Sequence, residues 1–225
     1  SDIDWDKTLL IANKFGAKYA LSAVNGTTSM WIALRAAGVG LGDEVIIPPY
    51  TFIATAVAVL LANAVPVFCD IDPETYNINP DKIEEKITSK TKAIIPVHIG
   101  GMPCDMDIIM RIAKKHNLFV LEDAAQAHYS SINNKMIGTF GDIGSFSFQM
   151  SKNMTAGEGG ILISDNEELI DRCFSFQNCG RIKGGAWYDH PYLAANNRMT
   201  AFQAAVLMEQ IDFCEEITIK REKNA

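Results

Sequence analysis

The sequence predicts an α/β fold in which a mostly parallel, mixed sheet is flanked by helices. Short runs rich in β-branched and aromatic residues alternate with segments of helical periodicity along the chain. Several of these runs are continuously apolar, as expected of strands that are covered on both faces. The length of 225 residues is enough for one large domain of this class. Such alternation is typical of a doubly wound domain.

The expected elements follow one another in a regular order. Strands are predicted in the segments 18–24, 43–49, 65–71, 92–98, 118–124, 143–149 and 159–164. Helices are predicted at Thr28–Ala37, Ile53–Asn63, Pro80–Ile87, Met106–His116 and Asn166–Phe176. A long irregular segment, Cys179–Asn197, comes after them, and loops of this length in compact domains are usually functional or contact a partner.

Composition and charge exclude several classes of protein. Hydrophobic residues make up 48% and charged residues 21% of the chain, as in ordinary globular proteins. The net charge of -7, without any basic run, argues against a nucleic-acid-binding surface. The longest apolar runs contain polar residues and are shorter than a membrane span, so no membrane partner is expected. No secretory signal pattern opens the sequence, and a cytoplasmic location is therefore expected.

The residues that commonly bind metals or form disulfides show no suitable spacing. The cysteines are odd in number, contain no CxxC pair and are interpreted as reduced, mostly structural thiols; they are Cys69, Cys104, Cys173, Cys179 and Cys214. Four aspartates, at 70, 72, 105 and 107, lie at a strand end and a helix start, where capping is expected rather than metal binding. His128 is the histidine expected nearest a ligand, and the other histidines are interpreted as structural.

Ligands of open α/β sheets bind beyond the carboxyl ends of the strands, and polar groups gather at those positions here. Asn25-Gly26-Thr27-Thr28 follows the first predicted strand and opens a helix. A glycine with hydroxyls at a helix N-terminus can bind a phosphate through free backbone N–H groups. The same residues could instead be a plain N-terminal cap.

Three further strand ends carry residues with two possible roles. Asp123 is either a helix cap or a buried partner for a cationic ring, and Phe52 is either a core residue or an aromatic that stacks on a ligand. Ser147 and Lys152 follow a strand, where the lysine is either a surface residue or held in a pocket. A phosphate cradle, a carboxylate, an aromatic face and a lysine together indicate a pyridoxal 5'-phosphate site. The carboxylate would keep the pyridine nitrogen protonated, and the lysine would carry the aldehyde as a Schiff base.

These motifs resemble a known family. The segments NGTTSMWIALRAAGVGLGDEVIIPPYTFIATA, VLEDAAQAH, SFSFQMSKNMTAGEGG and NNRMTAFQAA are similar to those of the DegT/StrS-type (DegT/DnrJ/StrS) sugar aminotransferases. The resemblance implies a pyridoxal-phosphate enzyme of the aspartate-aminotransferase fold, with residues 1–225 forming its cofactor-binding large domain. The N-terminal lead-in and the small C-terminal domain of the family are then expected outside this chain.

The resemblance assigns roles residue by residue. It implies that Lys152 forms the Schiff base and that Asp123 pairs with the pyridine nitrogen. Gln126 would approach the phenolic oxygen of the ring, and Phe52 would stack on the ring. The phosphate would be held by three residues of the same chain and, across a homodimer with shared active sites, by one residue of the neighbouring subunit; these are Gly26, Thr27 and Ser147, and Asn196.

The reaction that the resemblance implies is a transamination. Glutamate or glutamine would give its amino group to the cofactor, which would then aminate a keto-sugar nucleotide or a cyclitol ketone. FSFQ and MTAGEGG are also similar to aminohydroxybenzoate synthases, which aromatise their substrate. A regulatory relative that binds the cofactor without turnover is a further alternative. Tyr129 stands where the family usually has glycine and Ala201 where it often has an acidic residue, and both are expected to alter the substrate pocket.

Overall fold

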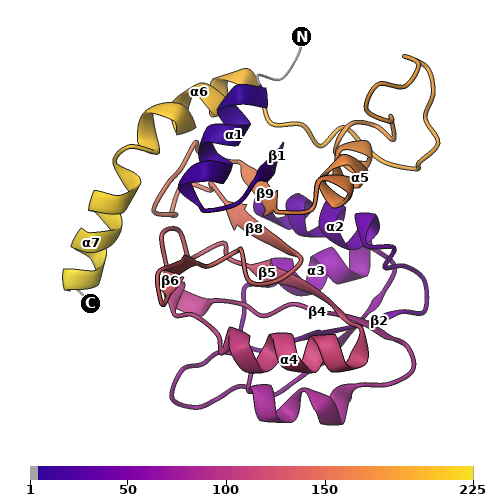
Figure 1. The fold of residues 1–225 in the computed structure, drawn as a ribbon, viewed down its shortest axis with the longest axis vertical. Coiled ribbons are helices and arrows are strands. Elements are labelled where there is room, and N and C mark those ends of the chain that lie inside the picture. The colour runs from indigo at the N-terminus through magenta and orange to yellow at the C-terminus, as the bar shows by residue number, and fades with distance from the viewer. Residues whose placement is uncertain (1–4, 225) are drawn as a thin grey trace.

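The computed structural model describes residues 5–224, and side chains from residue 10 onward, as a sheet with helices on both faces (Figure 1). The sheet has seven strands in the order β1-β9-β8-β5-β4-β2-β3. Their bounds are β1 Tyr19–Ala23, β2 Glu44–Ile47, β3 Val65–Phe68, β4 Thr91–Ile94, β5 Phe119–Asp123, β8 Ile143–Ser147 and β9 Gly160–Ser164. Within this sheet β9 runs antiparallel to β1 and β8, and the other neighbouring pairs are parallel. The predicted mostly parallel, mixed sheet is therefore confirmed.

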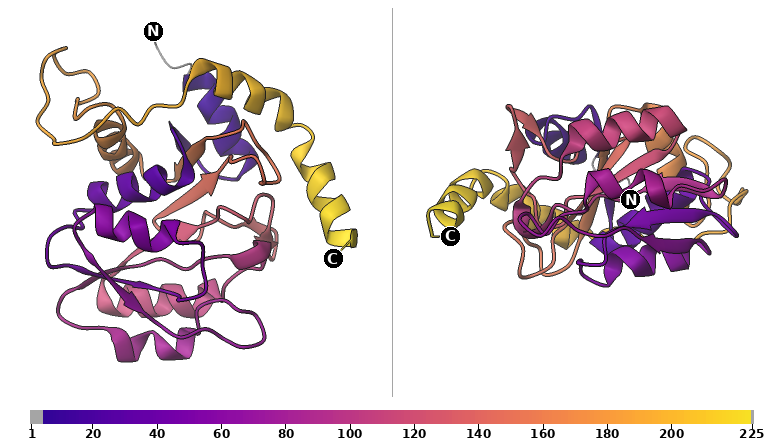
Figure 2. Two further views of the ribbon diagram at one scale, coloured as in Figure 1. Left: turned by 180° about the vertical axis from the view of Figure 1, so that it is seen from behind. Right: turned by 90° about the horizontal axis from the view of Figure 1, so that it is seen from below.

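The helices divide between the two faces of the sheet. Their bounds are α1 Trp5–Lys14, α2 Gly26–Ala36, α3 Ala54–Leu61, α4 Met106–His116, α5 Glu167–Gln177, α6 Ala201–Gln210 and α7 Cys214–Asn224. Figure 1 shows α4 in front of the sheet, and the view from behind in Figure 2 shows α2 and α3 covering the opposite face. α6 and α7 form an arm along the side of the molecule (Figure 1). None of the helices in the described part of the chain is long and apolar enough to cross a membrane.

The continuously apolar strands are buried on both faces, as their sequences predict. In β2, Val45 and Ile47 pack in the core cluster beneath α2 and α3, whereas Ile46 packs in the cluster beneath α4. This alternation follows from the strand geometry, because successive side chains point to opposite faces. A third cluster beneath α1 and α6 contains Phe146 and Phe148 at the end of β8. These clusters hold the sheet rigid where the strand ends carry polar side chains.

Two local expectations differ from the structure. The predicted helix Pro80–Ile87 is a pair of 3-10 turns, η1 Pro80–Lys82 and η2 Glu84–Lys86, closed by backbone bonds between residues three apart. Ile83 is the one buried residue between positions 80 and 87, and this is too little apolar contact to stabilise an α-helix. A two-stranded hairpin, β6 Ser131–Ile132 with β7 Lys135–Met136, was not predicted.

Candidate active site

A cavity of about 610 Å³ lies at the carboxyl edge of the parallel strands. Its walls come from the turn between β1 and α2, the segment before α3, the ends of β4 and β5, and the turn after β8. Seven of the eight site residues predicted from the sequence line it, which are Gly26, Thr27, Phe52, Asp123, Gln126, Ser147 and Lys152. The polar residues Asn25, His98, Gln149, Ser151 and Glu158 also line it. The fold thus brings together residues that are far apart in the sequence.

The N-terminus of α2 has backbone amides that face the cavity without a partner. Asn25 caps the helix, and its Oδ1 accepts a hydrogen bond of 2.8 Å from the amide of Thr28. Within the described residues the amides of Gly26 and Thr27 have no acceptor, as is usual for the first residues of a helix. A Cβ on Gly26 would lie 2.8 Å from the Cβ of Ser147, so only glycine lets this turn approach β8 so closely. The cap and the anion cradle are therefore compatible with each other.

Asp123 is buried at the end of β5, with 5% of its surface exposed. Its Oδ2 accepts a hydrogen bond of 2.8 Å from the hydroxyl of Thr55, and its Oδ1 accepts one of 3.2 Å from the amide of Ala125. The hydroxyl of Thr51 lies 2.8 Å from that of Thr55, so the two threonines form a chain of donors to the carboxyl group. Burial raises the pKa of Asp123, and these hydrogen bonds together with the charge of Lys152 oppose that rise.

Lys152 is half-buried in the turn after β8. Its backbone amide donates a hydrogen bond of 2.9 Å to the carbonyl of Gln149, which fixes the turn. Burial lowers the pKa of the lysine, and Asp123 partly opposes this. Within residues 5–224 its Nζ makes no hydrogen bond or ion pair. The amine is thus available to a ligand and is shifted toward its uncharged, nucleophilic form.

Gln126 and Phe52 provide a hydrogen-bond donor and an aromatic face. Oε1 of Gln126 accepts a hydrogen bond of 2.6 Å from the amide of Gly100, which leaves its Nε2 group to donate into the cavity. Phe52 is 71% exposed, so it is not the core residue that the sequence left possible. Ser147 accepts a hydrogen bond from the amide of Gln149, and its hydroxyl proton remains to be donated.

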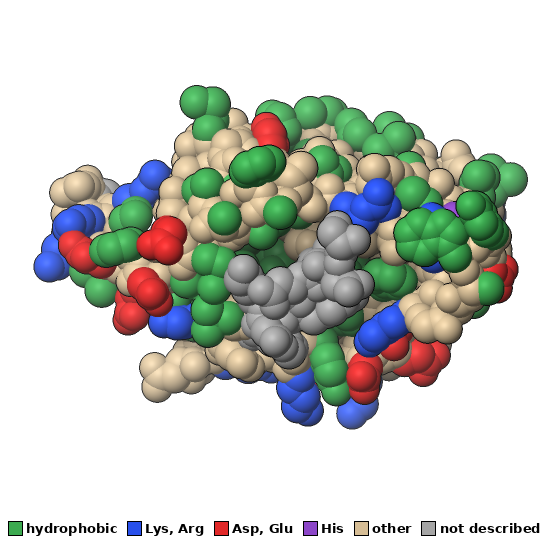
Figure 3. Space-filling model, turned by 90° about the horizontal axis from the view of Figure 1, so that it is seen from above, with side chains coloured by type: hydrophobic (Ala, Val, Ile, Leu, Met, Phe, Trp, Pro, Cys, Tyr) green, Lys and Arg blue, Asp and Glu red, His purple; other side chains and the backbone are tan. Residues whose placement is uncertain are grey.

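Asn196 lies outside this cavity, in the irregular segment. It is exposed and forms an isolated β-bridge with Asn178. The segment before it is irregular, as predicted, and displays Trp187, Tyr188 and Leu193, each more than two-thirds exposed. Figure 3 shows hydrophobic side chains at the end of the molecule away from α7, where this segment lies. Asn196 therefore does not line the cavity of its own chain.

Two residues that sequence reasoning placed near the cavity lie behind it. His128 is buried against the rings of Phe15, Phe146 and Phe148. Tyr129 packs against Phe15 and has a φ of 62°, the left-handed region that glycine favours. Neither lines the cavity. Tyr129 therefore does not contact the cavity of its own chain, and the expectation that it alters the substrate pocket is not supported there.

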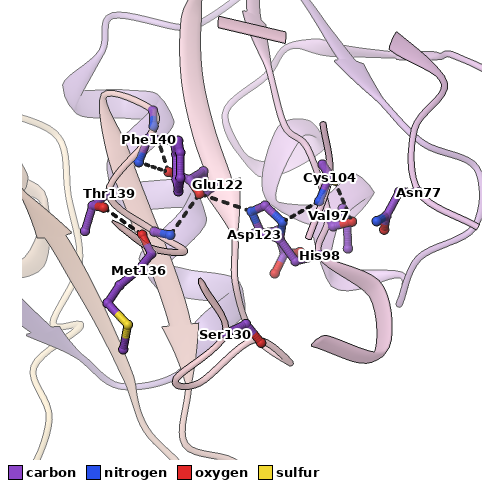
Figure 4. A network of polar contacts seen from close by, with 12 residues as sticks. Asn77, Val97, His98, Cys104, Glu122, Asp123, Ser130, Met136, Thr139 and Phe140 are labelled. Atoms are coloured by element: carbon purple, nitrogen blue, oxygen red, sulfur yellow. Dashed lines mark hydrogen bonds and ion pairs between the residues drawn. The ribbon is translucent and has the colours of Figure 1, made fainter. Parts of the chain in front are cut away.

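Sequence reasoning missed the groups that surround Asp123. Thr55 was one of several small residues in a predicted helix, and His98 was interpreted as a structural histidine. Glu122 precedes Asp123 on β5, and its side chain points to the opposite face of the sheet. Figure 4 shows Glu122 between the turn at Phe140 and the ring of His98. An acidic residue inside an apolar strand was the available signal, since such a residue needs buried partners.

Comparison with known proteins places the chain in a family. Residues 9–225 match the DegT/DnrJ/EryC1/StrS aminotransferase family. The chain belongs to that family. It is 45% identical over 212 residues to a protein of Streptoalloteichus tenebrarius named L-glutamine:3-amino-2,3-dideoxy-scyllo-inosose aminotransferase, covering 94% of this chain and 51% of that protein. It is 41% identical over 212 residues to the GDP-perosamine synthase of Caulobacter vibrioides, covering 94% of this chain and 57% of that enzyme. The chain thus spans about half the length of these relatives.

Several solved structures share this fold. An aminotransferase from Psychrobacter cryohalolentis superposes with a TM-score of 0.93 at 39% identity, covering 97% of this chain and 58% of that one. The Bacillus subtilis protein NtdA with bound PMP has a TM-score of 0.88 at 35% identity, covering 94% and 48%. A 3-amino-5-hydroxybenzoic acid synthase has a TM-score of 0.90 at 38% identity, covering 94% and 56%. The family resemblance and the fold inferred from the sequence are confirmed.

Proposed function

We propose that the full-length protein is a pyridoxal-phosphate-dependent aminotransferase that moves an amino group from glutamate or glutamine to a keto-sugar nucleotide or a cyclitol ketone. One observation carries the proposal: a buried carboxylate, a half-buried free amine and an open helix N-terminus line the same cavity. Membership of the DegT family and the names of its sugar- and cyclitol-converting members support the reaction class.

The cavity residues fit the cofactor. The free amides of Gly26 and Thr27 and the hydroxyl of Ser147 suit a phosphate, and the glycine is required by the close approach of Ser147. Asp123 suits a protonated ring nitrogen, Gln126 a phenolic oxygen, and Phe52 the face of the ring. When bound, pyridoxal phosphate supplies a carbonyl group that receives the amino group and a ring that accepts electrons.

Each residue of the cavity has its own role in the proposed reaction. Asp123 holds a proton at the ring nitrogen, with Thr55 and Ala125 donating to its two oxygens and fixing its direction. Nζ of Lys152 would hold the cofactor carbonyl and, when free, would accept the proton that leaves the α-carbon of the amino donor. Because burial lowers the pKa of Lys152, a larger share of its amine is uncharged and able to accept that proton than in an exposed lysine. Gly26, Thr27 and Ser147 anchor the phosphate and hold the reacting atoms within reach of the lysine.

We further propose a homodimer with shared active sites, in a cytoplasmic location. Asn196 is exposed and lies away from its own cavity, so it is available to the phosphate of a neighbouring subunit. The exposed aromatic residues of the irregular segment are of the kind that enrich protein interfaces.

An assay of donors and acceptors tests the proposal. The full-length protein is incubated with glutamate or glutamine and a panel of keto-sugar nucleotides and cyclitol ketones, and the aminated product is measured. Lys152→Ala should abolish both turnover and the visible absorbance of bound cofactor. A Lys152→Ala protein that still yields a borohydride-reducible link to the cofactor would refute the role of the lysine. Aromatisation without amino transfer would favour a synthase, a reaction suggested by the 3-amino-5-hydroxybenzoic acid synthase fold match.

A further inference from the structure

A second buried carboxylate lies directly beside Asp123 in the sequence. Glu122 is fully buried and accepts hydrogen bonds on both of its oxygens. Oε1 accepts from the amides of Phe140 and Gly141, each at 2.7 Å, and Oε2 accepts from the amide of Gly138 at 2.8 Å. Backbone N–H donors therefore meet both oxygens of the carboxyl group. The Glu122 side chain is thus held by a turn of the backbone.

The fourth partner of Glu122 is the ring of His98. Nδ1 of His98 accepts a hydrogen bond of 3.1 Å from the amide of Cys104, so the proton of the ring must be on Nε2. Nε2 lies 3.1 Å from Oε2 of Glu122 and donates to it. The ring is fully buried and is held in one orientation and one tautomer, with Glu122 on one side and Cys104 on the other (Figure 4).

His98 is also joined to Asp123 through the backbone. The amide of His98 donates to the carbonyl of Asp123 at 3.1 Å, and the amide of Asp123 donates to the carbonyl of Pro96 at 2.9 Å. The segment that carries the His98 ring is therefore paired with the residue that carries the functional carboxylate. His98 lines the same cavity as Asp123. The position of the His98 backbone is thus tied to the main chain of Asp123.

We propose that Glu122 and His98 are positioning residues, which hold the Asp123 carboxylate against the ring nitrogen of the cofactor. The inference rests on the proposed function. Glu122 and His98 would act on the cofactor only through Asp123. Glu122 anchors the His98 ring to the turn at residues 138–141, and the ring fixes the strand segment that pairs with Asp123. The competing account is that Glu122 only braces this turn.

Glu122→Gln tests the proposal in the full-length protein. The amide group must direct N–H donors either at two turn amides or at His98 and Gly138, so one side of the network opens in either orientation. We expect kcat to fall about tenfold while KM for the amino donor stays within about twofold, a loss usual for partners that orient a functional group. The NMR signal of cofactor labelled at its ring nitrogen should move toward the unprotonated position.

A matched control separates positioning from bracing. Asp142 accepts a hydrogen bond of 2.7 Å from the amide of Val120, so it joins the same turn region to the other end of β5 without touching His98. Asp142→Ala removes this acceptor, so it should lower the melting temperature and leave the ring-nitrogen signal in place. If Glu122→Gln behaves in the same way, Glu122 is only a brace and the proposal is wrong.

Variants of His98 keep the proposal testable should Glu122→Gln not fold. His98→Gln retains a side-chain N–H that can reach Glu122, whereas His98→Leu does not. The leucine variant should therefore shift the ring-nitrogen signal and lower kcat more than the glutamine variant does. Equal effects of the two changes would overturn the proposal. A parent protein that binds no cofactor would instead refute the proposed function itself.

Discussion

Acid should destabilise this protein through His128. The ring is 1% exposed and lies 5.4 Å from the ring centroid of Phe146 and 5.8 Å from that of Phe148. Within the described residues neither ring nitrogen makes a hydrogen bond of ordinary geometry. Burial lowers the pKa of His128 from 6.5 to about 3, the charge of Lys152 adds to this shift, and the backbone of Ser147 opposes it only in part. The folded state therefore keeps the imidazole neutral.

The magnitude follows from the difference in pKa between the two states. The unfolded chain binds a proton at His128 below pH 6.5, and the folded chain does so only below about 3. The stability that the neutral ring retains above pH 6.5 is lost as the pH falls toward 3, at about 1.4 kcal/mol per unit. Acidification from about pH 7 to about pH 5 crosses roughly 1.5 units of this window and should cost about 2 kcal/mol.

Denaturant unfolding of the wild type and of His128→Met at the two pH values measures this cost. Methionine fills an aromatic pocket well and does not titrate. The free energy of unfolding of the wild type should fall by about 2 kcal/mol more than that of the variant. Asp123, whose raised pKa has the opposite effect on stability, is present in both proteins and cancels in the difference. Parallel losses in the two proteins would show that the buried ring does not govern the acid response.

Three further predictions concern the cavity of the full-length protein. Asp123→Asn should retain cofactor and lower turnover on the order of 100-fold; turnover within about twofold of the parent would refute its role. Gly26→Ala places a Cβ 2.8 Å from that of Ser147 and should raise the cofactor dissociation constant about tenfold in a fluorescence titration, since overpacking displaces the cradle. Mixing equal amounts of Lys152→Ala and Asn196→Glu subunits should restore about a quarter of the activity if Asn196 serves the partner, and none if it acts within its own chain.

The sheet and the cavity could be predicted from the sequence because they depend on periodicity and on chain direction. β2 is apolar on both faces, and this alone requires helices on each side. Parallel strands end at one edge, so Gly26, Asp123 and Ser147 had to meet there once their strands were recognised. The role of Lys152 was inferred from these strand ends and from the resemblance to the DegT family, that of Gln126 from the resemblance alone, and both remain predictions.

The partners of these residues could not be predicted, because no local pattern encodes which buried polar groups meet. Thr55 lies in α3, and its contact with Asp123 depends on how that helix packs on the sheet. Glu122 and His98 meet across two strands. β9 runs antiparallel to β8 because the loop that contains Lys152 leads the chain straight back along its neighbour. The hydrophobic pattern does not distinguish such a loop from a crossover to a parallel strand.

The pKa shifts of Asp123 and Lys152 run in opposite directions and have the same main cause, which is burial. Burial raises the pKa of the carboxyl group and lowers that of the amine, so both groups are shifted toward their uncharged forms in the free cavity. A neutral amine is the form that attacks a carbonyl, and a carboxyl group of raised pKa can give a proton to a ring nitrogen. A protonated ring nitrogen beside Asp123 would offset the cost of burying its carboxylate. Cofactor binding should therefore stabilise the folded state. Thr55 and Ala125 already hold the two carboxyl oxygens of Asp123 in position for it.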